Sequence, residues 1–148
     1  MTVGGLEIPK LLSTLIATGV WPSGRDALAG QNNRSLIPPD RNRRLRRICS
    51  HPPPFATLAQ TGAGTNPDDF YARHGAVHEL VTGAAVEIAD RGLGADSPIL
   101  PDFRRGPADP SVIGLEWPGG GRGNTWVEMA PDFESFADML GPRPPAAA

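Results

Sequence analysis

The sequence predicts an α+β domain in which a mainly antiparallel sheet is flanked by helices. Three short segments between residues 97 and 130 are strand candidates, and the one at residues 111–117 has a cleanly apolar face, which is typical of a half-buried strand. Two other segments, residues 6–19 and 132–140, repeat apolar side chains with the period of a helix. Because the chain contains 18 glycines and 17 prolines, we expect short elements joined by many turns.

The length of 148 residues fits a single domain. We expect this domain to span residues 1–141, followed by a disordered tail over residues 142–148, which read PRPPAAA. No apolar run approaches the roughly 18 residues of a membrane span, and the start lacks the pattern of a secretory signal. Cys49 is the one cysteine and cannot form an intramolecular disulfide. Together these features favour a cytoplasmic protein.

The first predicted element is a helix over residues 6–19. Pro9 suits its first turn, and Gly19 suits the position just after its last turn. Trp21 follows at once and is expected to pack on the core. The apolar stripe of this helix consists of Ile8, Leu11, Leu12, Leu15 and Ile16.

The middle of the chain carries an arginine-rich segment, with five arginines at residues 41–47. Such a cluster can bind nucleic acid, but this one is short and has no interleaved aromatic residues for base stacking. We therefore interpret it as a solvated basic face and regard nucleic-acid binding as the weaker reading. A strand is predicted at residues 48–51, and Pro52 to Pro54 are expected to form an extended turn that carries Phe55 into the core. A further strand is predicted at residues 84–90.

The strands of the closing part are predicted at residues 97–103, 111–117 and 124–130. Pro101 cannot donate a ladder hydrogen bond, so it indicates an edge strand or a bulge. The glycine-rich linker between the last two strands favours an antiparallel hairpin. Strict alternation would place Trp126, Glu128 and Ala130 on one face of the last strand.

A helix is predicted to close the unit. Asp132 is a good N-cap, because its carboxylate can accept hydrogen bonds from the free N–H groups of the first turn. Gly141 and Pro142 then end the helix. Its apolar stripe consists of Phe133, Phe136, Ala137 and Leu140.

No catalytic, cofactor or metal site emerges from the motifs. His74 and His78 have the spacing of two metal ligands on a helix, but a third ligand is missing and Gly75 disfavours the helix. Cys49 and His51 could face the same side of a strand, but no third group indicates a catalytic dyad, and a small buried cysteine is the simpler interpretation. The glycine-rich segments match no phosphate-binding pattern.

The charge distribution points instead to a protein partner. The net charge is −2, but residues 1–50 carry +5 and residues 51–148 carry −7. An acidic surface suits a basic partner. We assign the candidate partner-binding carboxylates to the closing part of the chain: Asp102, Asp109, Glu116 and Glu128.

The segments GLGADSPILPDFRRGP, PSVIGLEW and NTWVEMAPDFESFADML resemble the C-terminal signature of the SUKH superfamily. This group contains bacterial toxin-immunity proteins and fungal cell-wall-assembly regulators of the Smi/Knr type. The matching positions are residues 94–99, the Asp102-Phe103-Arg104 triplet, and residues 126–140. The resemblance extends more loosely to IPKLLSTLIATGVWP and HPPPF near the N-terminus.

The resemblance implies a binding protein without enzymatic activity, cofactor or metal. Bacterial members bind and neutralise polymorphic toxins, often nucleases, so the implied partner is a basic toxin domain. The alternative within the same family is a scaffold or regulatory protein with no toxin partner. A toxin gene next to the gene of this protein would favour the first function, and a solitary gene would favour the second.

Overall fold

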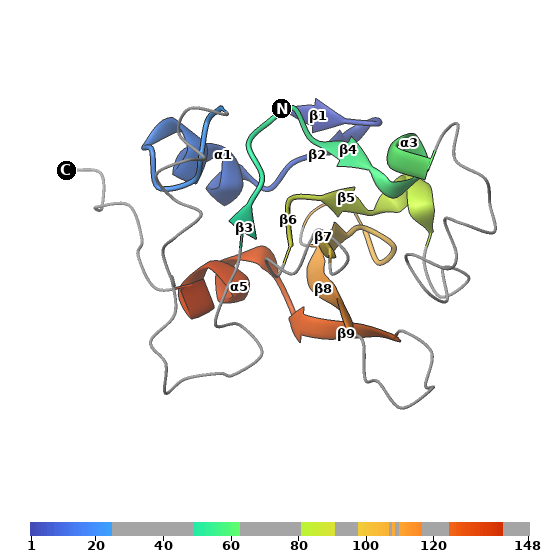
Figure 1. Cartoon of the computed structure of the whole chain (residues 1–148). Helices are drawn as coiled ribbons and strands as arrows, with labels where there is room; N and C mark the ends of the chain where they lie inside the picture. Colours follow the sequence, from blue (N-terminus) through green and yellow to red (C-terminus); the bar gives the residue numbers. More distant parts are fainter. Residues whose placement is uncertain are drawn as a thin grey trace.

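The computed structural model describes residues 1–24, 49–62, 81–90, 98–106, 108, 110–116 and 125–140. These residues form an α+β fold, as the sequence predicts, around a five-stranded antiparallel sheet (Figure 1). The strand order is β3-β6-β7-β8-β9. The strands are β3 (Cys49–Ser50), β6 (Ala89–Asp90), β7 (Pro98–Asp102), β8 (Ser111–Glu116) and β9 (Thr125–Ala130).

Two short strand pairs extend this arrangement. β4 (Ala56–Thr57) pairs with β5 (Val86–Glu87), and β1 (Thr2–Val3) pairs with β2 (Leu6–Glu7). The segment predicted as one strand over residues 84–90 is therefore interrupted at Ile88. It consists of a 3₁₀ turn, η3 (Thr82–Ala84), followed by β5 and β6.

Backbone hydrogen bonds nevertheless connect residues 85–90 continuously to residues 49–58. The amide of Leu58 donates to the carbonyl of Ala85 (3.0 Å), and the amide of His51 donates to the carbonyl of Ile88 (2.8 Å). Residues 49–58 therefore run beside residues 85–90, with the three prolines inserted between β3 and β4. The prolines lead to Phe55, which is buried as expected.

Pro101 lies in the central strand β7, so the expectation of an edge strand is wrong, whereas the expectation of a bulge is confirmed. Ala85 pairs with Asp102 and Ala89 with Ile99. Three residues of one strand therefore lie opposite two of the other. This is the arrangement of a bulge, and the missing N–H of proline is tolerated where the ladder is already broken.

The first helix, α1 (Lys10–Ala17), begins four residues later than predicted. Leu6 and Glu7 are taken up by pairing with β1, across a turn in which Gly4 and Gly5 have φ values of 56° and 82°. Two consecutive positive φ values are available to glycine at little cost. Gly19 ends the helix with a φ of 76°, as the sequence predicts.

The closing helix, α5 (Phe133–Leu140), confirms the prediction in both position and cap. The amide of Ser135 donates to Oδ1 of Asp132 at 2.7 Å. This hydrogen bond from the backbone lowers the pKa of Asp132 below its usual value, because it favours the ionised carboxylate. Asp132 is therefore the N-cap of α5.

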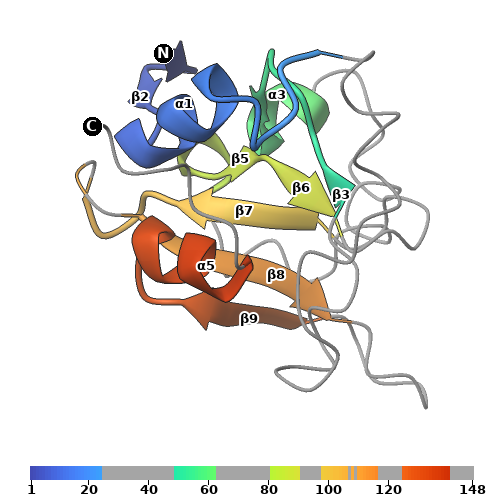
Figure 2. The same ribbon diagram turned by 90° about the vertical axis from the view of Figure 1, so that its left-hand side faces the viewer.

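Helices α1 and α5 cover the same face of the sheet, whereas α3 (Leu58–Gly62) lies on the opposite side (Figures 1 and 2). The main apolar cluster fills the space under α1 and α5. Its members include Leu12, Trp21, Ile88, Ile99, Val112, Phe133 and Phe136.

A smaller cluster, Leu58, Ala85, Leu100 and Ile113, lies on the α3 side of the sheet, and Trp126 packs against it. The prediction that Trp126 and Ala130 share a face is wrong, because Ala130 belongs to the main cluster. The register between β8 and β9 shifts between Val112 and Ile113. One extra residue in β9 at this bulge reverses the side to which the following residue points.

Several predicted features lie outside the described residues. These are the arginine-rich segment 41–47, His74 and His78, and the tail 142–148. Among the described helices, none is long and apolar enough to cross a membrane.

Candidate functional site

The four candidate carboxylates have different surroundings. Asp102 ends β7, and its side chain is 5% exposed. Arg104 binds it with three nitrogens: Nε at 2.8 Å and Nη2 at 2.7 Å from Oδ2, and the backbone N at 3.2 Å from Oδ1. Asp102 therefore does not contribute an open carboxylate to an acidic surface, which corrects that part of the prediction. Its visible role is to hold the turn after β7.

Glu128, in contrast, is exposed. Its side chain is 49% accessible, and Oε1 lies 4.0 Å from Nη1 of Arg105, which is itself 87% accessible. An ion pair this open and this long contributes little to stability. Glu128 is therefore accessible for a partner. Glu116 is the last residue of β8, but its side chain lies outside the described part of the structure, as does Asp109.

Two adjacent arginines thus form ion pairs with the two candidate carboxylates whose side chains are described. Arg104 holds the buried Asp102, and Arg105 reaches towards the exposed Glu128. Both arginines belong to the turn that connects β7 to β8, and both arginine side chains are exposed. The β7–β8 turn and β9 therefore form a mixed-charge surface at the last strand of the sheet.

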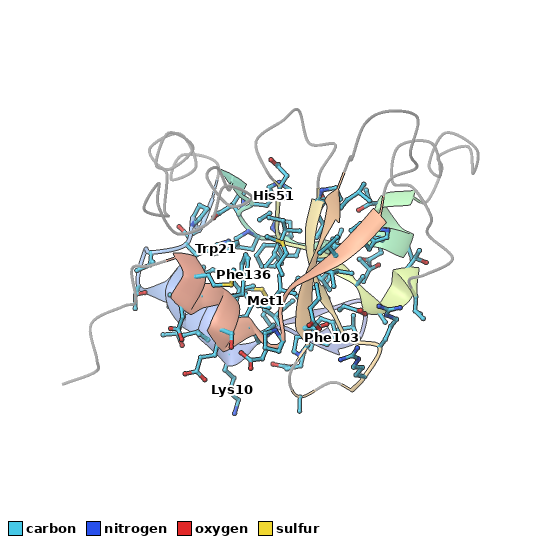
Figure 3. The ribbon with its side chains drawn as sticks, turned by 90° about the horizontal axis from the view of Figure 1, so that it is seen from below. Met1, Lys10, Trp21, His51, Phe103 and Phe136 are labelled. Carbon is cyan, nitrogen blue, oxygen red and sulfur yellow. The ribbon has the colours of Figure 1, made fainter. Side chains whose placement is uncertain are left out.

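A second group of titratable side chains surrounds His51, directly after β3. The Nε2 atom of His51 lies 2.7 Å from Oδ2 of Asp90, and Nδ1 lies 4.0 Å from Oε1 of Glu87. The two carboxylates are 10% and 17% exposed. The backbone carbonyl of His51 also accepts a hydrogen bond from Nε1 of Trp21 at 2.8 Å. Figure 3 labels the side chains of both residues. His51 therefore joins the exit of α1 to the sheet.

The charges around His51 favour the imidazolium ion. Burial alone would lower the pKa of His51, but the hydrogen bond with Asp90 and the charges of Glu87 and Asp90 outweigh it, so the pKa lies above its usual 6.5. Burial raises the pKa of Glu87 above its usual 4.5; His51 opposes this shift and Asp90 adds to it. Both groups therefore hold protons more tightly in the folded state than in the unfolded state.

This linkage predicts a pH dependence of stability. A raised folded-state pKa stabilises the fold fully below the unfolded pKa, and this stabilisation is lost as the pH rises through the folded pKa. For His51 the loss begins near pH 6.5 and extends upwards. We expect the difference in unfolding free energy between the wild type and His51→Gln to shrink over that range, as measured by urea titration at several pH values.

A second variant tests the cause of this pH dependence. Asp90→Asn preserves the shape of the side chain but removes the charge that favours imidazolium, so the pH dependence that His51 contributes should become smaller. If His51→Gln kept the full pH dependence of the unfolding free energy seen in the wild type, groups other than His51 would cause that dependence.

The structure gives His51 a different role from the Cys49–His51 dyad considered on sequence grounds. Cys49 lies in β3, but its side chain is not among those described. Both nitrogens of the His51 ring face carboxylates. Among the described residues, no group of three or more histidines, cysteines and acids is arranged to hold a metal ion.

Sequence reasoning missed Glu87 and Asp90. Three residues apart on a regular strand, they would face opposite sides of the sheet. The interruption at Ile88, between β5 and β6, turns both carboxylates towards His51. The available signal was the presence of two acids in an otherwise apolar strand.

Comparisons with known proteins add no relative to this description. No protein-family model matches the chain, and searches of curated proteins and of solved structures found no significant match.

Proposed function

We propose that this protein is a non-enzymatic binding domain of the SUKH type that recognises and neutralises a cognate toxin, acting in the cytoplasm. The described residues that carry the strongest SUKH resemblance lie in β7, β8, β9 and α5 and in the turns between them, and these elements are contiguous in space (Figure 2). Three of their aromatic side chains, Phe103, Phe133 and Phe136, are buried, and Trp126 is half-buried. This supports their interpretation as fold-determining residues.

The observation that carries the proposal is the charge of the last elements. Among the residues of β8, β9 and α5, together with Pro131 and Asp132, there are five acids and no lysine or arginine. Glu128, Glu134 and Asp138 are exposed. These exposed acids lie on both faces of this end of the sheet, with Arg105 beside Glu128. Their excess of negative charge would attract a basic protein, and they could cover the cationic cleft with which a nuclease binds its substrate.

If this protein inhibits its partner by covering the partner's active site, it needs no catalytic residues of its own. The partner's active site would be closed to its substrate, and the acidic side chains would take the positions of substrate phosphates. Charge complementarity would speed the encounter, while burial of apolar surface around the charges would hold the complex together.

The proposal is tested by capture of the tagged protein from lysate of its own host, followed by mass spectrometry, at low and at moderate salt. A single stoichiometric partner with a basic, nuclease-like or deaminase-like domain is the expected result, with slower association at the higher salt. Capture of several structural or metabolic proteins, or of none, would contradict toxin neutralisation and favour the scaffold function.

A charge reversal gives a kinetic prediction for that complex. Glu128→Lys should slow association about three- to tenfold, because an exposed charge acts mainly on the encounter rate. The melting temperature should hardly change, since Glu128 makes only a long, exposed ion pair. Stopped-flow or surface binding kinetics would measure the effect.

Glu7→Lys is the matched control for this reversal. Glu7 is also an exposed glutamate, with a side chain 60% accessible, but it lies in β2, far from β9 (Figure 1). Equal slowing by both variants would mean that only net charge matters and that β9 is not part of the binding surface.

A further inference from the structure

The two edges of the main sheet are protected to very different degrees. One edge is β3, which is two residues long, and a strand this short offers little to an incoming chain. The other edge is β9, which has six residues. β9 pairs with β8 on its inner side, and no described residue pairs with its outer side (Figures 1 and 2). Within the part of the chain that the structure describes, its outward N–H and C=O groups therefore have no strand partner.

The sequence of β9 carries only part of the usual protection against edge pairing, namely one charged side chain, Glu128, and one bulge. Natural edges carry lysine or proline, or are twisted by bulges. Thr125–Ala130 contains neither lysine nor proline, and its bulge lies near its end, where Ala130 rather than Met129 pairs with Val112. Residues 125–128 pair regularly with residues 116–113. A regular stretch of four residues therefore lies at this edge without a further strand among the described residues.

The charged residues beside the outer edge of β9 determine which kind of strand could bind there. Glu128 lies opposite Ile113, which belongs with Trp126 to the cluster on the α3 side of the sheet. Nη1 of the exposed Arg105 lies 4.0 Å from its carboxylate. The elements beside this edge, β8 and α5, add only acids to the charged residues. An incoming strand with lysine or arginine at alternate positions would pair with Glu128, whereas an acidic strand would be repelled.

We propose that the outer edge of β9 is the docking site for an extended basic segment of the partner protein, which adds to the sheet as a further strand. Main-chain hydrogen bonds along residues 125–128 give the affinity, and the Glu128 carboxylate selects basic side chains. This inference rests on the proposed binding function and specifies how the partner is held. The bulge and the following Pro131 confine the docked segment to about the length of β9.

The test uses the wild-type protein and a six-residue peptide that alternates valine and lysine and is blocked at both ends. Amide exchange is followed residue by residue by NMR. At a peptide concentration about ten times its Kd, the outward amides of β9 should exchange about tenfold more slowly, because only the unbound fraction exchanges. Amides of α1 and of β1 and β2 should not change.

Two further peptides separate backbone pairing from charge attraction. The same peptide methylated at every backbone nitrogen keeps its charges but cannot donate to a strand, and it should give no protection. A valine–glutamate peptide should bind more weakly than the lysine peptide. Glu128→Lys should reverse this preference, and Glu7→Lys should leave it unchanged.

Three results would overturn the proposal: no protection in β9, equal binding of the methylated peptide, or protection of the same amides by self-association without peptide. The last result would make a second copy of this chain the occupant of the edge. None of these results depends on a toxin. If the protein neutralises its toxin but β9 binds no peptide, only this docking mode is rejected. Peptide docking without neutralisation would reject the proposed function instead.

Discussion

Replacing Phe136 with alanine is expected to lower the free energy of unfolding by about 3–5 kcal/mol, as large-to-small changes at fully buried aromatic positions do. Phe136 has no exposed surface and belongs to the cluster between α5 and the sheet. Its ring centroid lies 6.0 Å from that of Phe133, at an angle of 49°. The change removes both the buried ring and its contact with a neighbouring aromatic ring.

Urea denaturation followed by circular dichroism would measure this loss as a lower midpoint. Glu134→Ala is the control, because it lies on the same helix with an exposed side chain, and surface changes usually stay within about 0.5 kcal/mol. Similar midpoints for Phe136→Ala and the wild type would show that α5 does not pack on the sheet as described.

Trp21→Ala should destabilise the fold by a comparable amount, about 3–5 kcal/mol. Trp21 follows α1, is 2% exposed and packs in the main cluster. It also donates its indole N–H to the carbonyl of His51 at 2.8 Å, across 30 residues of sequence. Trp21 therefore contributes both apolar burial and a hydrogen bond that attaches the N-terminal unit to the sheet.

A second pair of variants separates these two contributions. Trp21→Phe keeps most of the apolar volume but leaves the His51 carbonyl without its donor, which should cost about 1–3 kcal/mol. Trp126→Phe is the matched control, because the buried indole N–H of Trp126 has no acceptor among the described residues. An equal loss in both variants would show that the hydrogen bond to His51 contributes nothing.

The part of the chain from β8 to α5 could be predicted from the sequence because its signals are local. The N-cap at Asp132, the helical stripe through Phe133 and Phe136, and the alternation in β8 all act within a few residues. Each of these signals indicates the same structure, which is the condition under which sequence reasoning succeeds.

The errors arose where pairing overrides a local pattern. Leu6 and Glu7 were included in the predicted helix, but a two-residue glycine turn pairs them with Thr2 and Val3. The Gly4-Gly5 dipeptide was a readable hairpin signal. The bulge that moves Ala130 to the main cluster depends instead on the register between two strands, which no local pattern specifies.

The His51 cluster was beyond sequence reasoning for a related reason. His51 and Asp90 are 39 residues apart and meet only because β3 pairs with β6. Asp102 shows the converse case. The sequence shows that residue 102 is an acid, but its burial under Arg104 depends on the turn after β7. Only Glu128, among the candidate carboxylates whose side chains are described, is placed where a partner could reach it.

The most direct test of the central proposal, toxin neutralisation, is a growth assay in a host that expresses a toxin domain encoded beside the gene of this protein. Co-expression of the wild-type chain is expected to restore growth, and the purified chain should inhibit the toxin at a one-to-one ratio. Co-expression of Glu7→Lys should restore growth equally well. If the wild-type chain is expressed and folded but growth is not restored, toxin neutralisation is contradicted, and the scaffold function becomes the better explanation.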